Sequence, residues 1–411
     1  MFKKGGDKLE QFFDYILNDN EEVIIKGLKG NIKLADIVIP DQINGHPVTE
    51  IANYAFSNMK TLKTISFSKE MKKIGIAAFK NSGIESLTIR NNIRIVGIEC
   101  FSNCKKLSKV RWESNAPISG YCFYNCINLK DFDFLSVKYI GNRAFGNSGL
   151  NKIYLGENIE YVYDAAFEDC EELQTVDWLC KCDIPMLCFS GCIHLTDFDF
   201  FGVKVVGNSS FSSSGLKNIN LKPNIKKVMN GAFNHCENLI EVKWDCEADI
   251  PYNCFEKCTS LKKVEASDKT INIHEYAFGG CGQLSSVTGL HVSIVFSRCF
   301  MGCSSLASLD LLSAVRIDDF AFYGCGLVRL CLGKNTKVVG LNAFESCHSL
   351  RTVEWLCEAD IGKNCFLDCT RLEKVTISDK VRKIVFDAFP KCKDIDTVSY
   401  THLTLPTTSR V

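Results

Sequence analysis

Cysteine is the residue whose number and spacing could support chemistry in this chain. There are 23 cysteines in 411 residues, and 12 of them follow a recurring phenylalanine by three positions. Another six stand directly before that phenylalanine, so that six segments read Cys-Phe-x-x-Cys. Such a thiol pair could bind zinc if a neighbouring segment supplied the remaining ligands. A zinc site is one compact set of four ligands, however, whereas this pattern continues along the chain.

We therefore interpret these cysteines as small buried side chains, and we expect no metal and no cofactor. Ser148 and Ser214 occupy equivalent positions, which supports this interpretation because serine fits the same space and binds zinc poorly. The twelve that follow the phenylalanine are here named the ladder cysteines: Cys104, Cys126, Cys170, Cys192, Cys236, Cys258, Cys281, Cys303, Cys325, Cys347, Cys369 and Cys392.

Five cysteines stand outside both patterns, namely Cys180, Cys182, Cys246, Cys331 and Cys357. Cys180 and Cys182 form a Cys-x-Cys motif, which is a hint of redox or metal chemistry, and Cys331 is expected to project from a strand. Ordinary packing is the interpretation we favour for all five. The sequence contains no phosphate loop, dinucleotide fingerprint, nucleophile elbow or zinc-protease motif. We therefore expect no catalytic residues and no enzymatic activity.

The phenylalanine that positions the cysteines recurs at a nearly constant period. The fifteen intervals between its copies are 22 residues twelve times and 23 residues three times. A period of this length predicts a solenoid, because one repeat cannot bury its own apolar face and must stack on its neighbours. The copies are Phe56, Phe79, Phe101, Phe123, Phe145, Phe167, Phe189, Phe211, Phe233, Phe255, Phe278, Phe300, Phe322, Phe344, Phe366 and Phe389.

Other residues keep a constant distance from this phenylalanine. A leucine usually follows it by six positions, and apolar residues follow by nine and eleven, as in Val110 and Trp112. This apolar-x-apolar segment predicts a short strand with its apolar side chains pointing inward. Valine or isoleucine precedes the phenylalanine by five, often with glycine next, as in Ile140 and Gly141. That segment predicts a second short strand, and the phenylalanine itself is expected in a brief helical or 3₁₀ turn.

Together these positions read Ile/Val-Gly-x-x-Ala-Phe-x-x-Cys-x-x-Leu-x-x-Ile/Val-x-Ile. From about residue 20 to residue 396 the chain resembles the BspA-type leucine-rich repeat family. The resemblance implies a solenoid used in adhesion or protein binding, often on cell surfaces. The chain departs from the surface version in that residues 1–7 lack the apolar core of a signal peptide.

The predicted fold class is an α/β repeat solenoid, a leucine-rich-repeat coil of about 17 turns with 22–23 residues per turn. We expect an N-terminal segment at 1–20, the solenoid at 21–397 and a non-native disordered tail at 398–411. The tail matches no repeat position and resembles a translated sequencing adapter, so it is left out of the fold.

Composition narrows the class of partner. Lysine plus arginine and aspartate plus glutamate number 48 each, so the formal net charge is zero. Nucleic acid and anionic membranes both need a cationic excess, and we expect neither as the main partner. No apolar run approaches the ~18 residues of a membrane span. We expect a cytoplasmic monomer, with a cell-surface or secreted protein as the alternative implied by the family.

The outward positions of the predicted strands form the candidate binding surface, because stacked strands present a regular grid of side chains. The central stretch of this surface carries five aspartates and only one lysine. This excess of negative charge favours a basic partner or a cation. The candidate partner-binding residues are Lys109, Arg111, Asp131, Asp133, Lys152, Tyr154, Asp177, Asp197 and Asp199.

The function we predict is a non-enzymatic protein-binding or adhesion module whose partner is a protein, a host or surface protein being one option. Two alternatives stay open. The repeats could be the targeting arm of a truncated enzyme, or the chain could be a thiol-rich metal or redox protein.

Overall fold

The computed structural model describes residues 9–30, 32–267, 272–289, 293–392 and 397–399. Over these residues the chain is a repeat solenoid of stacked coils, each made of short strands joined by turns. It divides into two compact units, Met1–Phe198 and Asp199–Val411, which are taken here in turn. The stack has about 15 coils, so the expected count of about 17 is not confirmed.

Helix is nearly absent from the described residues. The one helix there is the 3₁₀ helix η1 (Leu9–Phe12), and no helix in this part of the chain is long and apolar enough to cross a membrane. The helical part of the predicted α/β class is therefore not confirmed. The segments around the recurring phenylalanines, expected as helical or 3₁₀ turns, are hydrogen-bonded turns instead.

The geometry of these segments explains why they are not helical. We name the residues from two before to three after each recurring phenylalanine the phenylalanine turn. Around Phe101, the Cys104 N–H closes a local turn onto the Phe101 carbonyl at 3.2 Å, but the Phe101 N–H donates to Cys122 of the next coil at 3.0 Å. Glu99 and Asn103 adopt the left-handed region, with φ of 57° and 58°. N–H groups that must reach the next coil cannot all point along a helix axis.

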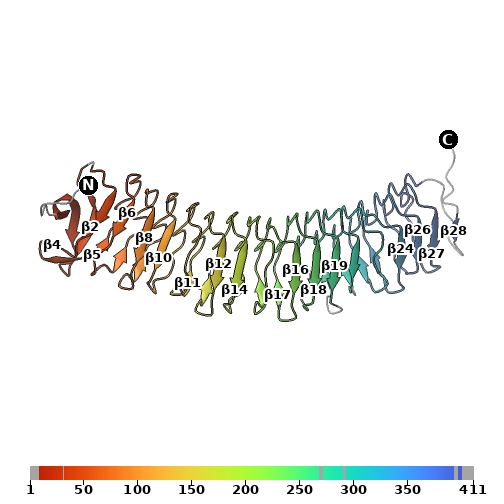
Figure 1. Cartoon of the computed structure of the whole chain (residues 1–411). Helices are drawn as coiled ribbons and strands as arrows, with labels where there is room; N and C mark the ends of the chain where they lie inside the picture. The colour runs from red at the N-terminus through yellow and green to blue at the C-terminus, as the bar shows by residue number, and fades with distance from the viewer. Residues whose placement is uncertain (1–8, 31, 268–271, 290–292, 393–396, 400–411) are drawn as a thin grey trace. The chain divides into compact units, whose positions relative to one another are not determined.

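Parallel pairing between coils builds the first unit (Figure 1). The sheet at its N-terminal end has the order β1-β2-β5-β7-β9, with β4 paired to β5, and a second sheet has the order β10-β8-β6-β3. The pairs β11-β13 and β12-β14 follow. The strands are β1 (Phe13–Leu17), β2 (Val23–Leu28), β3 (Asp36–Val38), β4 (Gln42–Ile43), β5 (His46–Ile51), β6 (Thr64–Ser66), β7 (Lys73–Ile74), β8 (Ser86–Ile89), β9 (Ile95–Val96), β10 (Lys109–Trp112), β11 (Tyr139–Ile140), β12 (Lys152–Leu155), β13 (Tyr161–Val162) and β14 (Thr175–Trp178).

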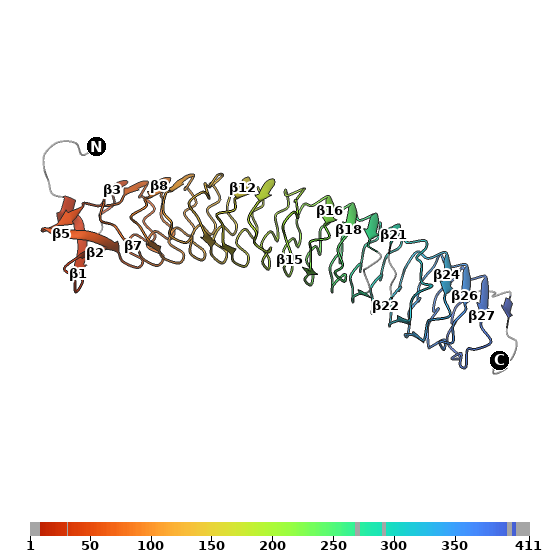
Figure 2. The same ribbon diagram turned by 90° about the horizontal axis from the view of Figure 1, so that it is seen from below.

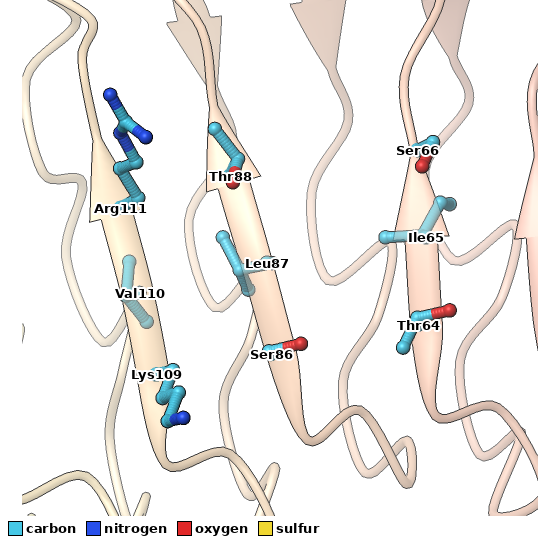
Figure 3. Close-up of a pocket in the computed structure, with 9 residues that line it drawn as sticks. All are labelled: Thr64, Ile65, Ser66, Ser86, Leu87, Thr88, Lys109, Val110 and Arg111. Atoms are coloured by element: carbon cyan, nitrogen blue, oxygen red, sulfur yellow. The ribbon is translucent and has the colours of Figure 1, made fainter.

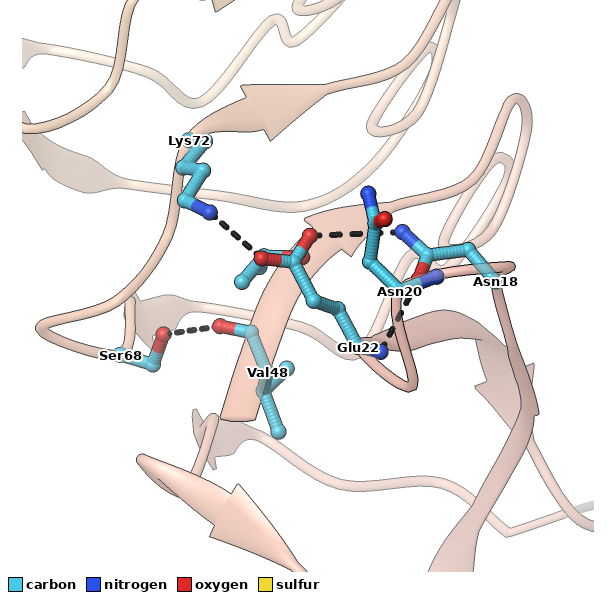
Figure 4. Close-up of polar contacts among 7 residues, drawn as sticks. Asn18, Asn20, Glu22, Val48, Ser68 and Lys72 are labelled. Atoms are coloured by element: carbon cyan, nitrogen blue, oxygen red, sulfur yellow. Dashed lines mark hydrogen bonds and ion pairs between the residues drawn. The ribbon is translucent and has the colours of Figure 1, made fainter. Parts of the chain in front are cut away.

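An antiparallel hairpin of β1 and β2 covers the N-terminal end of this unit, and the predicted boundary at residue 20 falls in its loop. Phe13, Val23 and Ile25 are fully buried there, so the first coil does not expose its apolar face. Glu22 fixes the hairpin, accepting hydrogen bonds from Lys72 Nζ at 2.5 Å and Asn18 Nδ2 at 3.3 Å (Figure 4). The hydrogen bond from Lys72 lowers the pKa of the Glu22 carboxyl.

The second unit repeats the same parallel pairing, as Figure 2 shows for β24, β26 and β27. Its sheets have the orders β15-β17, β16-β18-β19-β21, β20-β22-β23-β25 and β24-β26-β27-β28. The strands are β15 (Val205–Val206), β16 (Asn218–Leu221), β17 (Lys227–Val228), β18 (Glu241–Trp244), β19 (Lys263–Ala266), β20 (Asn272–Ile273), β21 (Ser286–Thr288), β22 (Ile294–Val295), β23 (Arg316–Ile317), β24 (Arg329–Leu332), β25 (Val338–Val339), β26 (Thr352–Trp355), β27 (Lys374–Ile377) and β28 (Thr397–Ser399).

Strand β28 bears on the predicted tail. It pairs with β27 in parallel register, and it includes residues 398 and 399, so the expected boundary at 397/398 falls inside a strand. The rest of the expected tail, 400–411, lies outside the described residues.

The recurring phenylalanines form the core of each unit. From Phe56 to Phe189 in the first unit, successive ring centroids lie 5.3–5.8 Å apart in stacked geometry. From Phe211 to Phe389 in the second unit, the spacing is 5.0–5.7 Å. All except the half-buried Phe389 are buried. The predicted burial of one aromatic ring per coil is confirmed, and these distances are favourable for offset stacking.

Candidate partner-binding face

Alternation along the strands separates a buried side from an exposed side. In β10 the exposure runs exposed, half-buried, exposed, buried, which places Lys109 and Arg111 outward and Trp112 inward. Parallel register aligns each outward residue with one in the next coil, as Lys109 with Ser86 and Arg111 with Thr88. We name the outward side chains of β3, β6, β8, β10, β12 and β14, and of β16, β18, β19, β21, β24, β26 and β27, the strand face.

A shallow depression of about 360 Å³ lies across β6, β8 and β10 in the first unit (Figure 3). Hydroxyl side chains line two of its strands, and Lys109 and Arg111 project from the third. The four hydroxyl residues are Thr64, Ser66, Ser86 and Thr88. A second depression of about 270 Å³ shares part of this lining and adds Arg90 and Glu113. Arg111 Nε lies 2.6 Å from Glu113 Oε1, so one of the flanking charges is already paired.

Sequence reasoning missed these hydroxyl residues, although the signal was present. Thr64 and Ser66 follow Phe56 by eight and ten positions, the same offsets that place Lys109 and Arg111 after Phe101. Extending the rule to the coils before Phe101 finds them, with offsets one shorter for Ser86 and Thr88, which follow Phe79 by seven and nine. What the sequence does not show is that small hydroxyl side chains leave the surface hollow there.

The nine predicted residues are all exposed, but the structure does not place all of them on strands. Lys109, Arg111, Lys152, Tyr154 and Asp177 lie on β10, β12 and β14. Lys152 Nζ approaches Asp131 Oδ1 at 3.8 Å, and the register of β12 with β14 sets Tyr154 beside Asp177.

The expectation of strand geometry is wrong for the other four, Asp131, Asp133, Asp197 and Asp199, which lie outside the strands. Asp133 accepts a hydrogen bond from the N–H of Leu135 at 2.9 Å, and Asp199 accepts one from Phe201 at 3.0 Å. A carboxylate that binds the backbone two residues ahead forms an Asx turn, which competes with strand pairing. These two aspartates therefore shape the chain besides carrying charge.

Several charges on the strand face of the second unit are paired to each other. Lys263 Nζ lies 3.3 Å from Glu241 Oε1 and also contacts Glu265, whose hydrogen bond raises the pKa of Lys263. Arg329 Nη2 donates to Glu354 Oε1 at 2.7 Å, and this hydrogen bond lowers the pKa of the Glu354 carboxyl. The half-buried Cys331 lies on β24, which agrees with its expected projection from a strand.

The ladder cysteines have a role that the sequence did not show. Except for Cys325, which donates to the Cys303 carbonyl at 3.4 Å, each ladder thiol donates to the carbonyl of the recurring phenylalanine in the preceding coil, as Cys104 Sγ does to Phe79 at 3.1 Å and Cys258 Sγ to Phe233 at 3.2 Å. Burial raises the pKa of Cys104 to about 11. Ser148 Oγ lies 3.4 Å from Cys170 Sγ, so serine occupies the same ladder. The predicted burial is confirmed, with Cys392 half-buried at its end.

The described part of the chain contains no cluster of side chains that could bind a metal ion. No three histidine, cysteine, aspartate or glutamate side chains there come together in a way that could hold an ion. The ladder cysteines instead stand at most one per coil, each with its own carbonyl partner, as Cys104 with Phe79 and Cys126 with Phe101.

A known family of repeat proteins matches most of this chain. The description "BspA type Leucine rich repeat region (6 copies)" matches residues 28–136, 116–240, 182–307, 243–351 and 293–405. No curated protein sequence matches the chain.

Solved structures are similar at low identity. A leucine-rich repeat protein from Bacteroides ovatus is 19% identical, with a TM-score of 0.52 over 92% of this chain and 100% of that one. A leucine-rich repeat protein from Eubacterium ventriosum is 18% identical, with a TM-score of 0.45 over 77% and 93%. A leucine rich cell surface protein from Faecalibacterium prausnitzii is 18% identical, with a TM-score of 0.37 over 95% and 94%. The first of these likenesses shows a shared fold. Because the matched segments overlap from residue 28 to residue 405, this chain belongs to the BspA-type leucine-rich repeat family.

Proposed function

We propose that this chain is a non-enzymatic protein-binding or adhesion module that contacts its partner through the strand face. The observation that carries the proposal is that buried and outward positions of the coils differ in how closely their residues repeat. Buried positions keep the same residue from coil to coil, whereas the outward positions stay in register but change from hydroxyl to basic to acidic side chains. A surface of this kind offers many weak contacts in a fixed order, which is how repeat proteins recognise partners.

The first unit has the better contact surface. Its hydroxyl-lined depression lies beside Lys109, and the side chain of Arg111 is 77% exposed. Asp131 and Asp177 are exposed farther along the same unit, and with Asp133 and Asp197 they make an acidic stretch that suits a basic segment of a protein. Both units carry ion pairs on the strand face, but the hydroxyl-lined depression lies in the first unit, and a partner on the second unit would compete with pairs such as Lys263 with Glu241 and Arg329 with Glu354.

Family membership favours the cell surface over the cytoplasm as the working compartment. Free thiols do not argue against this location, because the ladder cysteines other than Cys392 are buried, and burial raises the pKa of thiols such as Cys104 and Cys170, which keeps them in the unreactive thiol form. A protein partner outside the cell, such as a host or surface protein, is consistent with an adhesion role.

The test removes charge from the acidic stretch without disturbing the Asx turns. Asp131→Asn and Asp177→Asn together should lower the affinity for a lysine-rich probe peptide by about 3- to 10-fold, since each exposed charge contact contributes up to about 1 kcal/mol. Fluorescence anisotropy at low and high salt measures the change. The difference between the two proteins should shrink as salt rises.

The matched control makes the same chemical change in the second unit, with Glu241→Gln and Glu265→Gln. That variant should bind the peptide as the unchanged protein does. An equal loss of affinity in both variants would mean that the peptide responds to the overall charge of the protein. Unchanged binding in the first variant would show that the acidic stretch does not contribute to binding. The larger substitution of Asp131, Asp133, Asp197 and Asp199 to serine should weaken binding further while the protein still folds.

A further inference from the structure

The strand face of the first unit carries a group of hydroxyl and basic side chains around the depression of about 360 Å³. We name the outward residues of β6, β8 and β10 the hydroxyl window, and they are Thr64, Ser66, Ser86, Thr88, Lys109 and Arg111. Parallel register aligns Thr64, Ser86 and Lys109 in one row. It sets Thr88 beside Arg111 in a second row, at the level of Ser66 (Figure 3). Each row therefore presents hydroxyls on two strands and a cation on the third.

Most polar groups of the hydroxyl window have no partner among the described residues. Thr64 Oγ1 donates to Asp36 Oδ1 at 2.5 Å, whereas the other three hydroxyls make no hydrogen bond with a described residue. Lys109 likewise forms no ion pair with a described residue. Arg111 pairs with Glu113 through Nε, and its guanidinium has further N–H donors. The window can therefore offer donors and acceptors to a ligand without breaking contacts within the protein.

The floor of the window offers no site for an apolar anchor. Ile65 and Leu87 lie between the hydroxyls and are only 6% and 5% exposed, and Val110 is half-buried. Protein partners gain most of their affinity from large side chains that fill well-packed pockets, and this shallow surface does not provide one. A sugar instead presents many hydroxyls, each of which both donates and accepts hydrogen bonds, as serine and threonine hydroxyls do. The lining therefore suits a sugar better than a peptide.

Carboxylates limit the window on both sides. On one side Asp36 of β3 stands in register with Thr64. On the other side the exposed Asp131 and Asp133 follow Phe123 by eight and ten positions, the same offsets that place the two cations of the window. Repulsion disfavours an anionic chain over these carboxylates. Such a chain is therefore held across β6, β8 and β10, of which the outer two lie about 10 Å apart.

We propose that the hydroxyl window binds an anionic glycan. Its carboxylate or sulfate group contacts Lys109 and Arg111, and its sugar hydroxyls lie over the serine and threonine hydroxyls of β6 and β8. The inference goes beyond the proposed protein contact, because it assigns this part of the strand face to a sugar chain. A neutral glycan would leave the two cations unused, and an acidic peptide would leave most of the hydroxyls without partners.

The experiment measures binding of labelled oligosaccharides to the full-length protein by fluorescence anisotropy. The probes are hyaluronan, whose anionic group is a carboxylate, and chondroitin sulfate, which also carries sulfate. We expect saturable binding of at least one of them, and weaker binding of neutral dextran and of an oligoglutamate peptide of matched charge. Binding of hyaluronan would assign the anionic group to a carboxylate, and binding of chondroitin sulfate alone would assign it to a sulfate. Equal binding of dextran or of the peptide would overturn the proposal, as would the absence of saturable binding by both acidic glycans.

Two substitutions test the cation and the hydroxyl separately. Lys109→Gln should lower the affinity for the bound glycan by about 3- to 10-fold, because it removes one charge contact. Thr88→Val replaces a hydroxyl by a methyl group and should lower the affinity by about 2- to 10-fold. The matched controls are Lys243→Gln on β18 and Thr376→Val on β27, which change outward residues of the second unit and should leave glycan binding unchanged. Equal losses in the controls, or unchanged affinity in both window variants, would contradict the assigned site.

The variant with Asp131→Asn and Asp177→Asn separates this site from the acidic stretch. It should lower the affinity for the lysine-rich peptide but raise the affinity for the anionic glycan, by up to about 3-fold, because a repelling carboxylate beside the window is removed. A glycan affinity that rises while peptide binding is unchanged would support the window and reject only the acidic contact. A glycan affinity that falls together with peptide binding would overturn the separate glycan site.

Discussion

The phenylalanine turns and the strand face repeat with the same period, but the turns keep the same buried residues from coil to coil, whereas the strand face varies its exposed residues. In the turns, each coil places the same ring against the coil before it, and most coils also place a ladder thiol there, as Phe233 stacks on Phe211 and Cys258 donates to the Phe233 carbonyl. On the strand face the backbone register is equally regular, yet neighbouring residues such as Ser86 and Lys109 differ in kind. Constant positions therefore maintain the coil, and variable positions are available for recognition.

The largest test of this contrast is alkaline pH, because it acts at once on the many buried thiols whose pKa is raised. Burial raises the pKa of Cys104 and Cys170 to about 11 and of Cys281 and Cys325 to about 12. An unfolded thiol ionises near pH 8.5, so above that pH the unfolded state loses protons that the folded state keeps. Each such thiol lowers the free energy of unfolding by about 1.4 kcal/mol per pH unit until the folded pKa is reached.

Four thiols remove about 5 kcal/mol per pH unit, which is comparable to the whole stability of an ordinary domain. Stability should be complete below pH 8.5 and lost between about pH 9 and pH 11. Circular dichroism against pH measures the transition. A free energy of unfolding that stayed level across this window would contradict the buried, protonated ladder.

Removal of a single buried phenylalanine ring should have the next largest effect on stability. Phe233 is fully buried between Phe211 and Phe255, with centroids at 5.6 and 5.7 Å. Phe233→Ala should lower the free energy of unfolding by about 3–5 kcal/mol, because it leaves a cavity in a packed column. Urea denaturation measures the loss.

Phe201→Ala is the matched control, since Phe201 is 76% exposed beside the Asx turn of Asp199. Its stability should stay within about 0.5 kcal/mol of the unchanged protein. Comparable losses in both variants would show that the aromatic column does not carry the burial assigned to it.

The thiol of one ladder cysteine should contribute less than a ring. Cys258→Ala removes one of two donors to the Phe233 carbonyl, which keeps the Cys236 N–H at 3.4 Å, and the loss of one hydrogen bond should cost about 0.5–1.5 kcal/mol. Cys258→Ser keeps a donor of similar size, as at Ser148 and Ser214, and should lose less than the alanine variant. Equal losses in thermal melts of the two variants would assign the effect to volume and not to the hydrogen bond.

The smallest effect is expected on the strand face itself. Lys263→Ala removes a half-buried lysine that lies between Glu241 and Glu265. Surface ion pairs contribute little because water and salt screen them, so stability should fall by less than about 1 kcal/mol. A loss comparable to that of Phe233→Ala, measured by urea denaturation, would end the distinction between the two regions.

The sequence by itself determined the period, the buried ring of each coil and the outward strand positions, because those features repeat in register with Phe101 and its equivalents. It did not determine the helical content, since the Ala-Phe-x-x-Cys pattern is compatible with a helical turn as well as with the turn observed. It also placed Asp133 and Asp199 on strands, because an alternating pattern does not show whether a carboxylate will bind its own backbone.

Only the tertiary structure decided these points. Left-handed φ values at Glu99 and Asn103 are unfavourable for an isolated chain, and they occur because the next coil offers a carbonyl to the Phe101 N–H. The ladder cysteines find their acceptors in the same way, one coil back in the stack. Residues about 22 positions apart in sequence become hydrogen-bonding neighbours only when the coils stack, so no local pattern could have specified those contacts.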